Sequence, residues 1–215
     1  MNELLIGNKK LINSLGIKTK KNIYAPGNLI FESFYNNVLN NYGTIFQLKN
    51  DLVHTKVGLK WALNKFPKLN KIIYIGEVVP VNTLILKNHI IIANKILSLD
   101  DAPIEWNLDT KISYLVTNSE NKQIIRNSIN KNNLDFMYGD ILSINPLHQN
   151  PRTLQELKSS NICDAIDNLS FIINEFAKIN QLSIFNIFIG TPESYILNKK
   201  LDVKLITDHI FSKNK

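Results

Sequence analysis

The sequence predicts a single α/β domain in which a mixed central β-sheet is flanked by helices. Its 215 residues, of which 44% are hydrophobic and 20% charged, suffice for one domain with a sizeable core. Runs rich in Ile, Val and Tyr alternate with segments whose apolar residues recur at helical spacing, and no Pro- or Ser-rich linker interrupts them. This alternation is typical of sheets that bind ligands outside the carboxyl ends of their strands.

The first half is expected to begin with an N-terminal arm or short helix over residues 1–21, and the main domain is expected to span 22–215. Gly43 and Pro67 are typical of helix ends, so each is expected to close a helix. The elements expected before residue 70 are a short strand over 23–28, a helix over 29–39, a strand or strand end over 51–58 and a helix over 59–66.

The second half contains Ile-rich runs bounded by Gly or polar residues, the pattern of strands buried on both faces. These strands are expected at 71–76, 89–93, 111–117, 134–144 and 183–189. Amphipathic spacing predicts helices over 119–129, 166–177 and 203–211.

Composition limits the cellular setting. Cys163 is the only cysteine, so neither an intrachain disulfide nor a thiolate metal cluster can form. No apolar run reaches the roughly 18 residues of a membrane helix, and residues 1–10 hold too short an apolar stretch for a secretory signal. The reducing cytoplasm is the simplest location, and no membrane contact is expected.

The net charge of +7 has two explanations. One is a nucleic acid or another anionic partner. The other is the Lys-, Asn- and Ile-rich composition that AT-rich genomes encode. The lysines are scattered and no recognition motif accompanies them, which favours the second explanation and argues against nucleic-acid binding.

Three segments of the second half carry the most functional information, because each is a strand or helix that ends in small polar or acidic residues. They span 138–148, 162–168 and 184–194. Together with the block at 72–93 and the turn at 24–28, they resemble the nucleoside phosphorylase and nucleosidase superfamily over about residues 22 to 195. In that family one strand ends in a Ser-Ser-Asp-like turn, a helix opens with an Asp-Met-Glu-like acid, and a final strand ends in Ser-Asp.

The resemblance implies a nucleoside phosphorylase-like fold that needs no cofactor and cleaves the N-glycosidic bond of a purine nucleoside or thio-nucleoside. It also implies a homo-oligomer, a dimer or a hexamer. Cleavage passes through an oxocarbenium-like transition state, and it requires an acid near the departing base and an acceptor for the ribose hydroxyls. An active chain would be a hydrolase or a pentosyltransferase. The alternative is a catalytically decayed family member that acts as a nucleoside-binding or partner subunit.

Two catalytic residues follow from the resemblance. Asp167 lies nearest to the family's helix-opening Glu and would hold the ribose hydroxyls, although it is one methylene shorter and no Met precedes it. Glu193 would assist the departing base, although it follows Pro192 where the family has Ser-Asp. The structural alternatives are a helix-capping Asp, which applies to Asp164 as well, and a solvated turn at Glu193.

The remaining site residues are expected in the loops that follow strands. The substrate-binding set is Ser143, Asn145, His148, Asp164, Gly76 and Glu77, and the phosphate or anion loop is Gly27, Asn28 and Lys56. No metal site is expected, because the four histidines are spread along the chain. Glu77 would repel phosphate and Val79 lacks the freedom of glycine, so hydrolysis is favoured over phosphorolysis.

Overall fold

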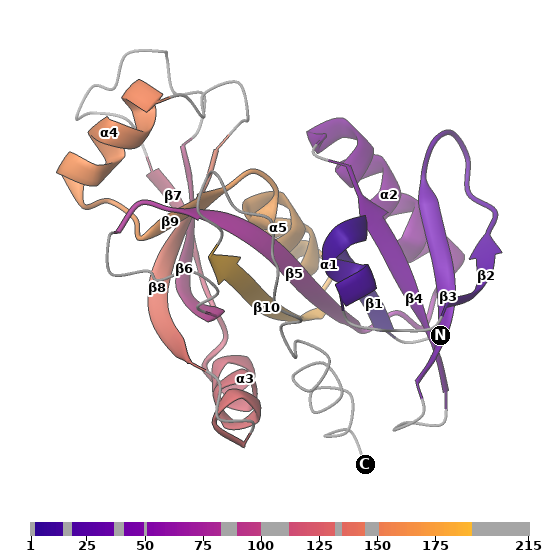
Figure 1. Cartoon of the computed structure of the whole chain (residues 1–215). Helices are drawn as coiled ribbons and strands as arrows, with labels where there is room; N and C mark the ends of the chain where they lie inside the picture. Colours follow the sequence, from indigo (N-terminus) through magenta and orange to yellow (C-terminus); the bar gives the residue numbers. More distant parts are fainter. Residues whose placement is uncertain are drawn as a thin grey trace.

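The structure is a computed structural model with one mixed β-sheet and helices on both sides of it (Figure 1). It describes residues 3–14, 19–36, 41–49, 51–82, 90–99, 112–131, 135–144 and 151–190. The strands are β1 (Glu3–Asn8), β2 (Thr19–Ile23), β3 (Ile30–Asn36), β4 (Asn41–Leu48), β5 (Lys71–Pro80), β6 (Ile90–Leu99), β7 (Ile112–Val116), β8 (Phe136–Ser143), β9 (Ala165–Asp167) and β10 (Ser183–Gly190). The helices are α1 (Lys9–Ser14), α2 (Leu52–Lys65), α3 (Ser119–Lys131), α4 (Pro151–Ser160) and α5 (Ser170–Ile179). This architecture confirms the α/β prediction.

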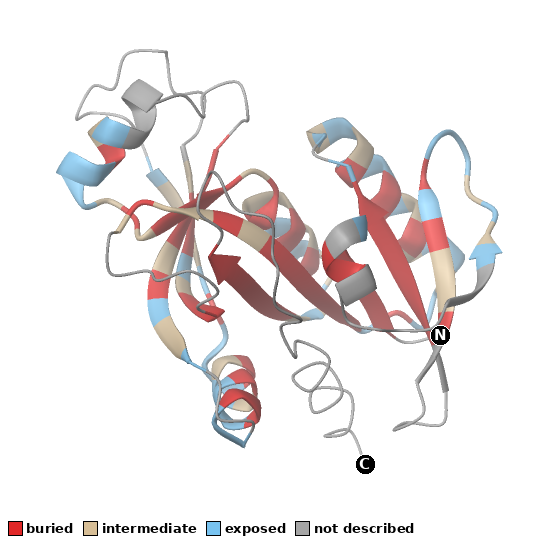
Figure 2. Cartoon of the chain, in the orientation of Figure 1, coloured by how far each residue is buried: buried red, intermediate tan, exposed pale blue. Residues whose placement is uncertain are grey.

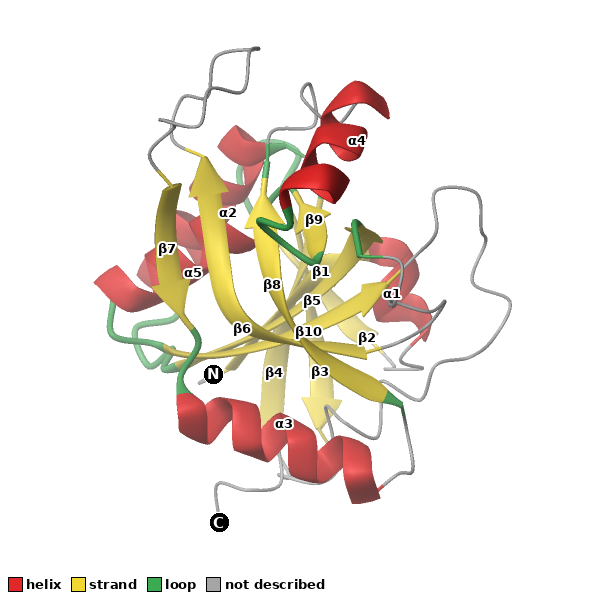
Figure 3. Cartoon of the chain, turned by 90° about the vertical axis from the view of Figure 1, so that its left-hand side faces the viewer, coloured by secondary structure: helices red, strands yellow, loops and turns green. Residues whose placement is uncertain are grey.

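The sheet has an open part and a closed part that share β5. In the open part, β1 lies between β4 and β5 and runs parallel to both. Strand β3 pairs antiparallel with β4, and β2 pairs antiparallel with β3 at the edge of the sheet. In the closed part, β10 pairs with β5 and β6, β8 pairs with β6 and β9, and β9 returns to β5. These five strands therefore form a ring, and α3 and α4 lie at opposite ends of it in the view of Figure 3.

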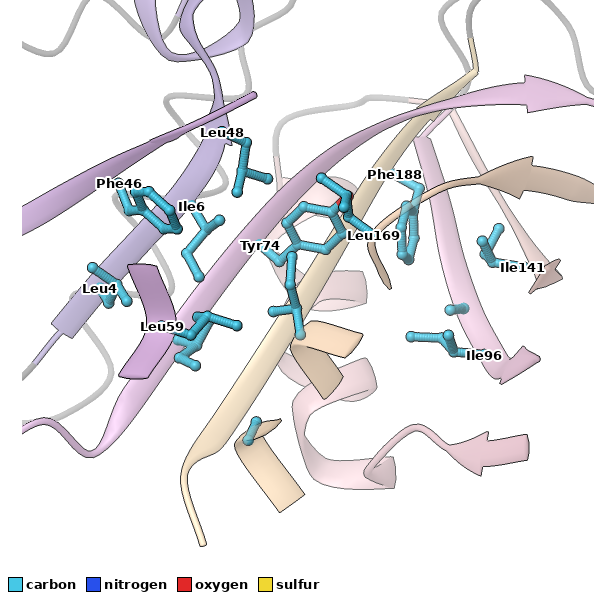
Figure 4. Packing of buried hydrophobic residues seen from close by; sticks show 14 of the residues in the cluster. Leu4, Ile6, Phe46, Leu48, Leu59, Tyr74, Ile96, Ile141, Leu169 and Phe188 are labelled. Atoms are coloured by element: carbon cyan, nitrogen blue, oxygen red, sulfur yellow. The ribbon is translucent and has the colours of Figure 1, made fainter. Parts of the chain in front are cut away.

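Buried residues are concentrated on β5 and the strands beside it (Figure 2). One core cluster joins the sheet to α2 and α5, a second joins its other face to α1 and α3, and a third lies under α4. Alternate residues of β5 enter the first two clusters: Tyr74 belongs to the first and Ile75 to the second. Figure 4 shows Tyr74 beside Leu169 and Phe188, whose ring meets the Tyr74 ring edge-on at 5.7 Å between centroids. The strand predicted at 71–76 is thus confirmed as buried on both faces.

The segment predicted as an N-terminal arm or short helix over residues 1–21 contains the short helix α1, but it also contains a strand of the sheet. Glu3–Asn8 is the central strand β1, which is paired on both edges, and Leu4, Leu5 and Ile6 are completely buried. A parallel strand with two covered faces is a continuous apolar run rather than an alternating one. Leu4, Leu5 and Ile6 form such a run, but β1 has only six residues, so the run is short and gives a weak strand pattern.

Two further elements differ from the prediction. The segment expected as a helix over 29–39 contains strand β3, which pairs with β4 along its whole length. Gly43 lies within β4 instead of ending a helix, and an added Cβ there would lie 2.5 Å from the Phe34 ring. The strand expected over 51–58 is the first half of α2, because the Asp51 carboxylate accepts the His54 backbone N–H at 3.0 Å and so caps the helix.

The later elements agree better with the sequence. The strands expected near 89–93, 111–117, 134–144 and 183–189 and the helix from Ser119 are confirmed. The helix expected from residue 166 begins at Ser170, since residues 165–167 form β9, and α4 was not predicted. The helix expected over 203–211 lies outside the described residues. None of the described helices is long and apolar enough to cross a membrane.

Candidate functional site

A cluster of polar side chains lies where β5 leaves β1 and begins to pair with β9. The β1–β5 pairing ends at Gly7 and Ile75, and the β5–β9 pairing begins at Val79. Ser143, the last residue of β8, lies opposite Asp167 in the register of β8 and β9. Polar residues from the ends of β1, β8 and β9 therefore meet beside the second half of β5.

Asp167 is the centre of this cluster and is only 4% exposed. The Tyr74 hydroxyl and the Ser170 backbone N–H donate to its Oδ2 at 3.1 and 2.9 Å, and the Ser170 hydroxyl donates to its Oδ1 at 2.7 Å. Ser143 is a further hydrogen-bond partner. Asp167 thus joins β5, β8 and β9 to the first turn of α5, although the N-cap residue of that helix is Leu169.

The environment of Asp167 favours its neutral form. Burial raises the pKa of Asp167 from 3.8 to about 6, although the hydrogen bonds from Ser170, Tyr74 and Ser143 act in the opposite direction. Burial also raises the pKa of Tyr74, and the neighbouring Asp167 and Glu77 add to the effect. Tyr74 is therefore a hydrogen-bond donor that stays protonated near neutral pH.

Glu77 and Asn8 form a second pair beside this cluster. The Asn8 Nδ2 donates to Glu77 Oε2 at 2.9 Å, across 69 residues of sequence. Between Tyr74 and Glu77 lies Gly76, where a Cβ would come 3.0 Å from both the Tyr74 hydroxyl and the Phe188 ring. The structure thus brings Gly76, Glu77, Ser143 and Asp167 of the predicted site into one neighbourhood.

Asp164 lies at the other end of β9 from Asp167. Its Oδ1 accepts the Asn82 side-chain N–H at 3.0 Å, and its Oδ2 accepts the Asp140 backbone N–H at 2.8 Å. The Asp164 carbonyl also accepts the backbone N–H groups of Val81 and Asn82. These contacts tie the end of β5 to the middle of β8, so the Asp164 carboxylate has a structural role.

The predicted anion loop lies at the same edge of the sheet but away from Glu77. Gly27 has a φ of +65°, which favours glycine, and the His54 Nε2 lies 3.2 Å from the Asn28 carbonyl oxygen. Lys56 is exposed half a turn further along α2. The loop precedes β3, which is three strands from β5, or about 14 Å at the usual strand spacing.

Three predicted site residues, Asn145, His148 and Glu193, lie outside the described residues. In the described part of the chain, no group of three or more His, Cys, Asp or Glu side chains is placed to hold a metal ion.

Sequence reasoning missed Asn8, Tyr74 and Ser170 as members of the cluster. Their signals were weak: a polar residue directly after an apolar strand at Asn8, and a hydroxyl within an apolar run at Tyr74, where burial demands a hydrogen-bond partner. Neither pattern predicts which residue is the hydrogen-bond partner. Tyr74 and Asp167, for example, are 93 residues apart in the sequence.

No protein-family model matches the sequence, and no curated protein matches it. Solved structures do match it in fold. The 5′-methylthioadenosine/S-adenosyl homocysteine nucleosidase of Campylobacter jejuni has 13% identity and a TM-score of 0.76, over 99% of this chain and 95% of that one. The Helicobacter pylori nucleosidase of the same name has 13% identity and a TM-score of 0.73, over 97% and 94%.

A third match is the futalosine hydrolase of Helicobacter pylori strain 26695, with 14% identity and a TM-score of 0.74 over 97% of this chain and 94% of that one. The three matches span nearly the whole of both chains. The chain therefore shares its fold with these two nucleosidases and this hydrolase.

Proposed function

We propose that this protein hydrolyses the N-glycosidic bond of a purine nucleoside or thio-nucleoside. The observation that carries the proposal is the Glu77 carboxyl group, which Asn8 holds near Tyr74 where β5 leaves β1. A carboxyl group at such a place supplies the proton acceptor that attack by water requires. The similar structures support this reading, since they are nucleosidases and a hydrolase of futalosine.

Hydrolysis is favoured over phosphorolysis for an electrostatic reason. Two like charges 4 Å apart repel by about 4 kcal/mol near a protein surface, so an ionised Glu77 would oppose a bound phosphate. Gly27 and Asn28 of the proposed anion loop precede β3, which lies three strand spacings, or about 14 Å, from the strand that carries Glu77. They are too far away to offset that repulsion directly.

The other site residues keep the roles proposed for them. Glu193 is the proposed acid for the departing base, and Asn145 and His148 are proposed to line the pocket. A ribose-binding role for Asp167 requires that the ribose hydroxyls replace one of its present donors, Tyr74 or Ser170. The same condition applies to Asp164 and its donors.

A release assay tests the function. The purified protein is incubated with adenosine, inosine, guanosine, methylthioadenosine or adenosylhomocysteine, with and without phosphate, and the products are separated by chromatography. Release of free base without phosphate is expected. Release that needs phosphate would instead identify a phosphorylase.

The second candidate is a catalytically decayed member of this fold that binds a nucleoside or serves as a partner subunit. The full set of hydrogen bonds at the buried Asp167 carboxylate favours this candidate, because no oxygen is left for a ligand without rearrangement. Saturable nucleoside binding in a calorimeter, with no base released at high protein concentration, would select it.

We also propose that the chain forms a homo-oligomer with itself. Val53 and Val57 lie on the outer side of α2, opposite the buried Gly58 and Ala62, and they are 71% and 50% exposed. Adjacent exposed apolar side chains on a helix favour contact with another protein surface. Sedimentation should show a dimer or hexamer, and replacing both valines by Glu should shift it toward monomer.

A further inference from the structure

Strand β7 has an outer edge that no other described strand covers. Its five residues pair antiparallel with β6, from Ile112 opposite Leu99 to Val116 opposite Lys95. No other described strand pairs with β7, which lies at the margin of the strands in Figure 3. Such an edge presents a row of backbone N–H and C=O groups with which a further strand can pair.

The hydrogen-bond register shows which residues of β7 face this edge. The Thr117 backbone N–H donates to the Asn94 carbonyl oxygen at 3.1 Å, one step beyond the pairing of Val116 with Lys95. Residues of an antiparallel strand turn their backbone groups alternately toward and away from the neighbouring strand. Ile112, Tyr114 and Val116 therefore turn theirs away from β6, and no described group bonds to them there.

The same three residues expose apolar side chains. Ile112, Tyr114 and Val116 are 37%, 62% and 67% exposed, and as alternate residues they lie on one face of the sheet. Edge strands are usually protected from further pairing by a charged residue, a proline or a bulge. Strand β7 contains none of these, since its sequence is Ile-Ser-Tyr-Leu-Val and its register with β6 is regular. Both its backbone and its side chains thus suit contact with another strand.

We propose that β7 pairs antiparallel with β7 of a second copy of this chain, about a two-fold axis at Tyr114. Tyr114 then lies opposite the partner's Tyr114, and Ile112 lies opposite the partner's Val116. These residues form three pairs that each exchange two backbone hydrogen bonds, or about six in all. The two sheets become one continuous sheet across a self-complementary contact.

The symmetry of the strand favours a second copy over an unrelated protein. The exposed apolar residues are placed evenly about Tyr114, so each one meets an apolar residue across the axis. No charged residue lies within β7, so no like charges face each other. Lys95 of β6, whose Nζ is 5.8 Å from the Tyr114 ring centroid, lies at least three strand spacings, or about 14 Å, from the partner's Lys95. That separation exceeds the screening length of about 8 Å at physiological salt.

This contact is additional to the one proposed for Val53 and Val57 on α2, and it does not depend on the hydrolase function. The two contacts involve different elements, so each can be removed while the other is kept. A chain with two different self-complementary contacts can also build assemblies larger than a dimer.

Cysteine cross-linking tests the register. In the proposed pairing the two Tyr114 Cα atoms are about 5.5 Å apart, within the range of a disulfide, so oxidised Tyr114→Cys should form covalent dimers on a non-reducing gel. Ile112→Cys is the matched control on the same strand, because its counterpart lies four residues further along, or about 14 Å away, and should not cross-link. A mixture of Ile112→Cys and Val116→Cys should cross-link. Wild type is the blank, since its Cys163 is buried.

A charge substitution tests whether the contact holds the assembly together. Tyr114→Lys places two like charges opposite each other, so it should weaken association at least about tenfold in sedimentation. It is measured in a chain that also carries Val53→Glu and Val57→Glu, so that the α2 contact does not mask the loss. Ile179→Lys, a matched change at a 72% exposed residue of α5, should leave association unchanged. Thermal melting checks that each variant is folded.

The outcomes separate this contact from the earlier proposals. Cross-linking of Tyr114→Cys and of the mixed pair, without cross-linking of Ile112→Cys alone, would support the pairing. Equal cross-linking of all single variants, or of none at high protein concentration, would overturn it. A folded Tyr114→Lys variant that associates as well as the Ile179→Lys control would also overturn it. Base release by the wild type is measured separately, and its presence or absence leaves this result unchanged.

Discussion

Replacing Asp167 with Asn should remove a pH dependence from the stability of the protein. Burial raises the pKa of the Asp167 carboxyl group from 3.8 to about 6 in the folded state. The folded protein thus holds this proton more tightly than the unfolded chain, so stability is greatest at low pH and falls as pH rises through the interval from about 4 to about 6. The pKa difference between the folded and unfolded states corresponds to about 3 kcal/mol of unfolding free energy. About 2 kcal/mol of this is lost between pH 4.0 and pH 7.5.

The Asn variant has no charge to bury, and its amide oxygen can still accept from Tyr74 and the Ser170 N–H. Urea unfolding of both proteins from pH 4.0 to 7.5 gives the difference in the free energy of unfolding. The free energy of unfolding of Asp167→Asn, relative to that of wild type, should increase by about 2 kcal/mol between pH 4.0 and pH 7.5. Tyr74→Phe, which removes a donor to the carboxylate, should steepen the fall of stability with pH.

A difference that stays constant with pH would refute this reasoning. A difference that moves in favour of wild type would refute it more strongly, because it would mean that the folded state stabilises the ionised carboxylate. The same variant also bears on function, since the loss of base release in a folded Asp167→Asn protein would support a catalytic role for the residue.

Three other substitutions test the packing. Gly58→Ala adds a Cβ that collides with the buried Phe46 ring. The overpacking cost of about 1–3 kcal/mol should exceed the gain of about 1 kcal/mol in helix propensity, so the Tm should fall. An unchanged or raised Tm would contradict this. Lys71→Met leaves Glu3 unpaired in the core and should cost about 3–5 kcal/mol in urea unfolding, and adding Glu3→Gln should recover most of it. Asn174→Ala breaks a reciprocal pair of amide hydrogen bonds to β10 and should cost about 1–3 kcal/mol; a neutral result would show that the pair adds nothing to stability.

The sequence predicted the strands of the closed part well, because their signal is local. Ile72, Ile73 and Ile75 form a β-rich run whose length and boundaries fit a strand with two buried faces. Strand β3 was misread since Phe31, Phe34 and Tyr35 happen to recur at helical spacing, although aromatic residues favour strands. Residues 30–36 form a strand because they pair with β4. Such pairing depends on residues outside the local sequence pattern.

The candidate site was predictable only in part for the same reason. Glu77 could be placed at a functional position because it follows a glycine in a buried strand. Its partner Asn8 could not, since nothing near Asn8 indicates that β1 lies beside β5. The sequence could favour Asp167 over Asp164 only by resemblance; in the structure they lie at opposite ends of a three-residue strand and bond to different elements.

The ring of strands constrains the order in which the chain can complete its fold during synthesis. β10 is the last described strand, and it pairs with both β5 and β6, more than 80 residues earlier in the chain. Until residues 183–190 emerge, β5 and β6 each have an edge without its final partner, and unpaired strand edges promote association between chains. The interval between synthesis of β6 and of β10 is therefore when the nascent protein is most exposed to aggregation, and it is when a chaperone would be most useful.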